Sequence, residues 1–121
     1  MRLYLEISTP TPSSIAARAL PSSERLRFFT SRLSRLEYLS KPLAQGDAAK
    51  QALFEGAFEA PGLVSVSDEL LEQAVSLRAQ FGLRSTDAVH LATTIADNAD
   101  VFLTGDRQLA RCTDINVVPI P

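Results

Sequence analysis

Residues 85–106 read S-T-D-A-V-H-L-A-T-T-I-A-D-N-A-D-V-F-L-T-G-D, and this stretch decides the fold. Its apolar residues recur at the i, i+3, i+4, i+7 and i+8 positions that form one face of a helix: Ala88, Leu91, Ala92, Ile95 and Ala96. The pattern predicts a helix that begins at Ser85–Thr86. A short apolar run at 101–103 then predicts a buried strand that ends in the turn Thr104-Gly105-Asp106.

Strands and helices alternate along the rest of the chain. The patterns predict strands near 3–5, 26–29, 63–66 and 115–118, a short helical turn at 15–20, and helices over 30–39, 47–58 and 67–81. Ser67 and Gly82 suit the two ends of the last of these helices, and Pro42 is expected to end or kink the first. We therefore expect residues 1–121 to form a single α/β domain, with a parallel sheet of about four or five strands and helices on both faces.

The composition excludes several classes of protein. No run approaches the roughly 18 apolar residues of a membrane span, so no membrane association is expected. Cys112 is the only cysteine, which rules out an intramolecular disulfide and favours a cytoplasmic location. His90 is the only histidine, which rules out most zinc sites. It lies off the apolar stripe, and we expect a hydrogen-bonded structural role for it.

Charge is unevenly distributed although the net charge is only −2. Residues 1–50 carry +4 and residues 51–121 carry −6. Arg25, Arg27, Arg32 and Arg35 form a basic stretch that could contact phosphates, or could be a solvated helix face.

Four acidic residues occupy positions suited to a common site. Glu6 follows the strand at 3–5 and Asp106 follows the strand at 101–103, and the carboxyl ends of parallel strands form the ligand crevice of open α/β sheets. Asp87 lies in the first turn of its helix, beside the apolar stripe, and Glu37 also lies beside an apolar face.

Acids at the edges of buried faces are costly unless something pairs with them, and neighbouring carboxylates repel one another. A hard cation such as Mg²⁺ (or Mn²⁺) resolves that conflict with oxygen ligands. The simpler alternative is that Asp106 caps the following turn and Asp87 favours the helix dipole.

The stretch 85–93 together with 99–109 closely resembles the C-terminal half of PIN domains, and most of all the VapC-type toxins of toxin–antitoxin pairs. Residues 30–37, T-S-R-L-S-R-L-E, resemble the family's motif around its central glutamate, and residues 4–8 resemble its first strand. The resemblance implies a PIN-like three-layer domain and a Mg²⁺- or Mn²⁺-dependent endoribonuclease.

The same resemblance implies roles for individual residues. Glu6, Glu37, Asp87 and Asp106 would be the catalytic acids and metal ligands. Thr104 would lie beside the metal, and Ser8 would lie near Glu6. Arg32 and Arg35 could hold the RNA backbone. The family pattern also implies a homodimer and a partner antitoxin.

Two departures from the family pattern leave an alternative open. Glu6 stands where the family has aspartate, and the extra methylene would move the carboxylate by about 1 Å, whereas catalytic sites tolerate about 0.5 Å. Residues 9–24 are short and rich in proline. A catalytically weakened PIN-like domain that binds RNA or protein is therefore the second hypothesis. A phospho-receiver or a phosphoaspartate phosphatase fits poorly, because the lysine and paired acids that they need are not in the expected places.

Overall fold

The computed structural model describes residues 2–6, 27–57 and 62–119. The elements in chain order are β1 (Arg2–Leu5), β2 (Arg27–Ser31), α2 (Leu33–Gln45), α3 (Ala48–Ala57), β3 (Leu63–Val64), α4 (Asp68–Phe81), α5 (Ser85–Ala96), β4 (Val101–Thr104), the 3₁₀ helix η2 (Arg107–Arg111) and β5 (Val117–Pro119). The helical turn expected at 15–20 and the candidate Ser8 lie outside the described residues.

The sheet has five strands in the order β3-β2-β1-β4-β5, and all of its strand pairs are parallel. Tyr4 at the centre of β1 pairs with Phe29 of β2 on one side and Phe102 of β4 on the other. The prediction of a parallel sheet in an α/β domain is therefore confirmed. Because every strand runs the same way, the carboxyl ends of β1, β2 and β4 all lie at one edge.

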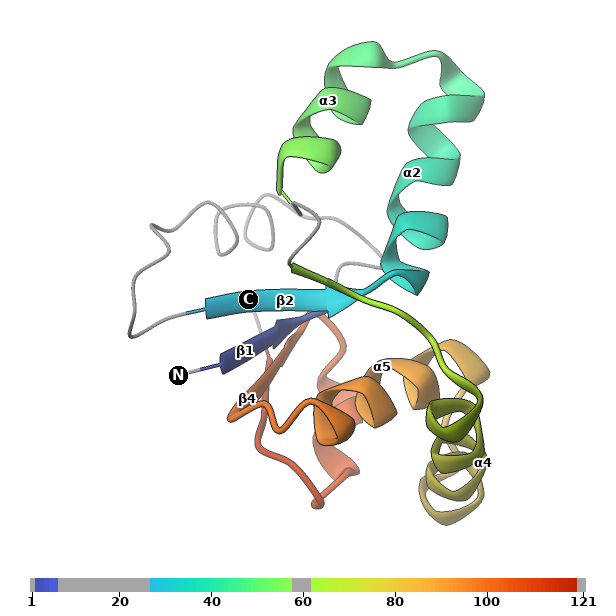
Figure 1. Cartoon of the computed structure of the whole chain (residues 1–121), viewed down its shortest axis with the longest axis vertical. Helices are drawn as coiled ribbons and strands as arrows, with labels where there is room; N and C mark the ends of the chain where they lie inside the picture. The colour runs from blue at the N-terminus through green and yellow to red at the C-terminus, as the bar shows by residue number, and fades with distance from the viewer. Residues whose placement is uncertain (1, 7–26, 58–61, 120–121) are drawn as a thin grey trace.

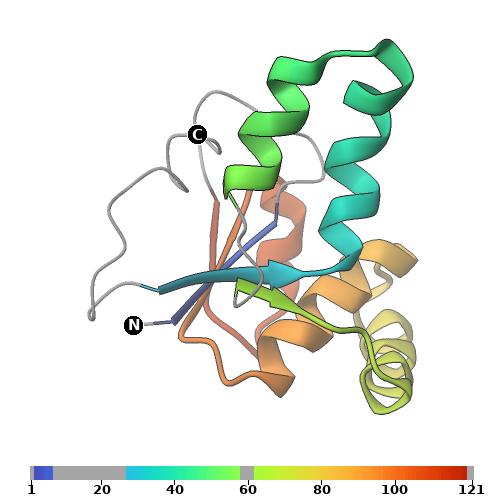
Figure 2. The same cartoon turned by 45° about the horizontal axis from the view of Figure 1, so that its top comes forward.

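Helices cover both faces of the sheet, as Figures 1 and 2 show: α2 and α3 lie on one side, and α4 and α5 on the other. The alternation of β1 explains the two layers. Leu3 and Leu5 pack in a cluster with residues of α2 and α3, whereas Tyr4 packs with residues of α4 and α5. Within the described ranges, no helix combines the length and the apolar character needed to cross a membrane.

The prediction that α2 ends near Leu39 is wrong. The helix continues to Gln45 with a buried Pro42 inside it, and it ends at Gly46, whose φ of 65° is a left-handed cap that glycine adopts without strain. The strand before it also runs longer than the predicted 26–29. Ser31 stays in β2 because its backbone pairs with Val64, and its hydroxyl accepts the N–H of Leu33 at 3.1 Å.

Helices α4 and α5 begin and end close to where the sequence predicts. The Ser67 hydroxyl accepts the N–H of Leu70 at 3.2 Å, and Gly82 ends α4 with a φ of 64°. Helix α5 packs against α4 and also contacts β2 and β4. Helix α5 is therefore buried over more of its circumference than the apolar stripe alone. His90, which lies off that stripe, has no exposed surface.

Candidate metal site

Glu6 and Thr104 meet where β1 and β4 end. The backbone N–H of Glu6 donates to the Leu103 carbonyl at 2.9 Å, which continues the pairing of the two strands. The Thr104 hydroxyl donates to Glu6 Oε2 at 3.0 Å and accepts the N–H of Asp106, also at 3.0 Å. One buried hydroxyl thus connects the two acids that sequence reasoning placed at this edge.

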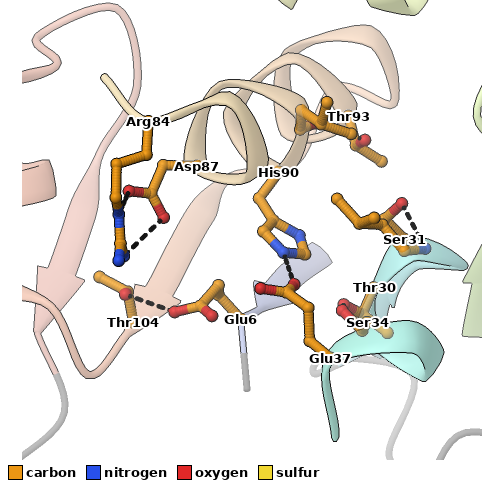
Figure 3. A network of polar contacts seen from close by, with 12 residues as sticks. Glu6, Thr30, Ser31, Ser34, Glu37, Arg84, Asp87, His90, Thr93 and Thr104 are labelled. Carbon is orange, nitrogen blue, oxygen red and sulfur yellow. Dashed lines mark hydrogen bonds and ion pairs between the residues drawn. The ribbon is translucent and has the colours of Figure 1, made fainter. Parts of the chain in front are cut away.

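Glu37 reaches the same region from the second turn of α2. Its Oε1 contacts Nε2 of His90, which lies on α5. Donor atoms of Glu6, Glu37 and His90 all lie within 4.8 Å of one another. Two segments that are far apart in the sequence, the end of β1 and helix α2, therefore bring the carboxylates of Glu6 and Glu37 close together at the edge of the sheet (Figure 3).

A directed chain of hydrogen bonds fixes the orientation of His90. The Ser31 N–H donates to Tyr4 Oη at 3.1 Å, and that hydroxyl also contacts His90 Nδ1. Burial raises the pKa of the Tyr4 hydroxyl far above its ordinary value, so the hydroxyl keeps its proton and is a donor available to Nδ1. When Nδ1 accepts this hydrogen bond, Nε2 carries the ring proton and donates it to Glu37. His90 is hydrogen-bonded on both sides, as predicted for a structural histidine.

Asp87 and Asp106 share a different partner, the guanidinium of Arg84. Arg84 Nε lies 2.9 Å from Asp87 Oδ2 and its Nη2 lies 3.4 Å from Asp87 Oδ1. The same Nη2 lies 3.9 Å from Asp106 Oδ2. Asp106 Oδ1 accepts the N–H of Gln108 at 2.9 Å, so one oxygen caps η2 and the other faces Arg84. The hydrogen bond to Asp87 is the main cause that raises the pKa of Arg84.

A cavity of about 450 Å³ opens beside this second pair of acids. Its lining includes Arg84, Asp87 and Asp106 together with Gln108 and Arg111. The Arg111 guanidinium donates to the Gly82 carbonyl at 3.1 Å. The cavity therefore presents two carboxylates and two guanidinium groups, a combination that suits a cation and a phosphate side by side.

The four predicted acids form two pairs that adjoin each other. Glu6 and Glu37 form one pair, whose donor atoms lie close to His90. Asp87 and Asp106 form the other pair, and both of them contact Arg84. Figure 3 shows Glu6 between the Arg84–Asp87 ion pair and the His90–Glu37 contact. The oxygens of these carboxylates and of Thr104 are hard donors of the kind that Mg²⁺ and Mn²⁺ prefer, so the donor set fits such an ion.

The two predicted RNA-binding arginines differ in their contacts. Arg32 is exposed just before α2. Arg35 instead forms a bidentate ion pair with Glu55 of α3, with both N–O distances at 2.7 Å. Part of the basic stretch therefore holds α2 and α3 together.

Sequence reasoning missed Arg84, Arg111 and Tyr4 as parts of this region. Arg84 precedes Asp87 by three residues, a spacing at which side chains at a helix start can pair. Tyr4 interrupts an otherwise apolar strand, and a buried tyrosine hydroxyl needs a partner. Arg111 carried no sequence signal, because its place depends on how η2 packs against the end of α4.

Comparisons with known proteins agree with this architecture. Residues 5–114 match the model of the PIN domain family. A solved structure described as a toxin–antitoxin complex from Klebsiella pneumoniae superposes with a TM-score of 0.68 at 18% identity, covering 98% of this chain and 96% of that chain. A search of curated proteins found no significant match. Since the family model spans nearly the whole sequence, the chain belongs to the PIN domain family.

Proposed function

We propose that this protein is a Mg²⁺- or Mn²⁺-dependent endoribonuclease that hydrolyses RNA phosphodiesters. PIN domains are generally nucleases. The observation that carries the proposal is the convergence of Glu6, Glu37, Asp87 and Asp106 from four separate segments onto one edge of the sheet. Outside a cation site, so many partly buried carboxylates in one place would repel one another.

The four acids would hold the cation, which supplies a nucleophile at neutral pH and charge stabilisation for the phosphoryl group. The surrounding residues fix the acids. Thr104 orients Glu6 through its 3.0 Å hydrogen bond, and His90 orients Glu37. Arg111, which lines the cavity, would contact a phosphate of the bound strand. The reacting phosphodiester would lie in the cavity next to Asp87 and Asp106.

The biological role that we propose is that of a toxin held inactive by an antitoxin. The support is the fold similarity to a chain of a toxin–antitoxin complex, together with the residue pattern of the C-terminal half. The homodimer stays a prediction from the family resemblance, and the cytoplasmic location stays a prediction from the single cysteine. Co-purification with the product of a neighbouring small gene is the direct test of the partner.

Cleavage of single-stranded RNA tests the enzymatic proposal. Wild-type protein should cleave with Mg²⁺ or Mn²⁺ and stop when the metal is chelated. Asp87→Asn should lower the rate by about 100-fold or more, since removing one preorganised charged group from a catalytic site typically costs that much. Asp68→Asn, an exposed acid in the first turn of α4, is the matched control and should cleave like the wild type. Equal rates for both variants would mean that the acids are misassigned.

The second candidate is a catalytically weakened PIN domain that acts by binding RNA or protein. The observation that favours it is Glu6, which lies between the Arg84–Asp87 ion pair and the His90–Glu37 contact and carries one methylene more than the family's aspartate. Glu6→Asp separates the candidates. A large gain in cleavage would show that the natural protein is impaired, and a loss would show that the site, including the Thr104 contact, is adapted to glutamate.

A further inference from the structure

Arg84 is an exposed residue whose charged group nevertheless folds back onto the site. It stands just before α5 in extended backbone, and its side chain is 72% exposed. An arginine on the surface gains little from an isolated ion pair. Here, however, its fork contacts both oxygens of Asp87, a side chain that is only 6% exposed.

The Arg84 guanidinium also forms an ion pair with a second acid, Asp106, which comes from another segment. Its Nη2 lies 3.9 Å from Asp106 Oδ2, and Asp106 lies beyond β4, across the cavity lining. Two carboxylates that would repel each other thus share one positive group. A buried carboxylate left without a partner is costly, so this cation stabilises the arrangement of the acids.

We propose that Arg84 is an internal counter-ion that competes with the divalent metal for Asp87 and Asp106. The inference rests on the proposed function, because it assumes that these two acids are ligands. Both oxygens of Asp87 accept from the guanidinium, at 2.9 and 3.4 Å, and the lone pairs used in this way are closed to a cation while the contact lasts. Metal binding therefore displaces the guanidinium. The high exposure of the Arg84 side chain lets it leave without disturbing the core.

The competition gives the site a defined resting state. Without metal, Arg84 keeps the two acids in place and neutralises part of their charge. With metal, the guanidinium is released at the wall of the cavity that also holds Arg111. The apparent metal affinity of the natural protein is lowered, because each binding event includes the loss of an ion pair.

Metal affinity measured by calorimetry, with Mn²⁺ and Mg²⁺ each as the titrant, tests the competition without any activity assay. Arg84→Met keeps the aliphatic stem and removes the charge, and it should bind metal about three- to tenfold more tightly than the wild type. Arg111→Met is the matched control. It removes the same charge from the same cavity, but its guanidinium contacts the Gly82 carbonyl rather than an acid. Its affinity should stay within about twofold of the wild type, because no ion pair with an acid has to break when the metal binds and an exposed charge is screened by salt.

Thermal unfolding supplies a second readout. Arg84→Met should unfold at a lower temperature than the wild type without metal, and the difference should disappear at saturating metal. The inference is overturned if Arg84→Met binds metal like the wild type or more weakly, or if both variants gain equally. If neither the wild type nor Arg84→Met binds metal, the proposed metal-dependent function falls as well. Wild-type binding with an unchanged Arg84→Met overturns the counter-ion alone.

Discussion

The two pairs of acids at the edge of the sheet are held in contrasting ways. Glu37 is fixed by a series of hydrogen bonds that runs from Ser31 through the buried side chains of Tyr4 and His90. Asp87 and Asp106 are held by one exposed guanidinium beside an open cavity. The contacts of Glu6 and Glu37 are largely shielded from solvent and salt. Asp87 and Asp106, in contrast, can exchange the exposed Arg84 guanidinium for another cation. We infer that the contacts of Glu6 and Glu37 give the site its fixed geometry, and that ligands enter beside Asp87 and Asp106.

The largest expected effect is the loss of stability when the hydrogen bonds of His90 to Tyr4 and Glu37 are removed. His90→Leu leaves the Tyr4 hydroxyl and the Glu37 carboxylate without their partner, and should lower the free energy of unfolding by about 3–5 kcal/mol. Urea denaturation measures it. Thr94→Val, a buried change on the same helix at a hydroxyl that donates to the His90 carbonyl, is the control and should cost about 1 kcal/mol. Similar losses of stability in the two variants would contradict the claim that the hydrogen bonds of His90 to Tyr4 and Glu37 contribute more than an ordinary buried hydrogen bond.

Tyr4→Phe should have an intermediate effect. It keeps the ring that stacks on Phe102, with centroids 5.1 Å apart, and removes only the hydroxyl. The Ser31 N–H and His90 Nδ1 then lose their partner, and stability should fall by about 1–3 kcal/mol.

Nitrogen NMR of the imidazole gives an independent check of this chain, because His90 is the only histidine and a tag-free sample gives a single set of signals. The wild type should show the neutral tautomer protonated at Nε2. A tautomer protonated at Nδ1 would contradict the direction of the chain.

The smallest effect should be seen at Arg32 and Arg35, the two basic residues around the start of α2. RNA binding is measured in metal-free buffer at several salt concentrations, and the logarithm of the binding constant is plotted against the logarithm of the salt concentration. The magnitude of the slope should fall by about one in Arg32→Ala. Arg35→Ala should leave the slope unchanged, because Glu55 already neutralises Arg35. A larger change for Arg35 than for Arg32 would show that the ion pair opens when RNA binds.

The fold was predictable from local patterns, whereas the pairing of the acids was not. The apolar spacing of α5 and the caps Ser67 and Gly82 are signals carried by neighbouring residues, and they predicted helices close to the observed ones. Pro42 misled the prediction, because its place inside α2 depends on burial and on the left-handed stop at Gly46.

The edge of the sheet was likewise predictable, since strand ends follow from topology. Which acid faces which partner depends instead on side chains from separate elements. Glu6 is the clearest case. In the sequence it differs from the family pattern, and in the structure it lies between the Arg84–Asp87 ion pair and the His90–Glu37 contact and accepts a hydrogen bond from Thr104. Its position at the end of β1 could be predicted, but its contacts could not.

A crystal structure of the protein soaked with Mn²⁺ tests the central claim most directly, because the anomalous signal locates the ion without ambiguity. The account predicts an ion bound by Asp87 and Asp106 together with Glu6 or Glu37, with the Arg84 guanidinium moved away from Asp87 and the His90–Glu37 contact intact. An ion bound elsewhere, or no ion at the sheet edge while Arg84 still bridges the two aspartates at saturating metal, would contradict it.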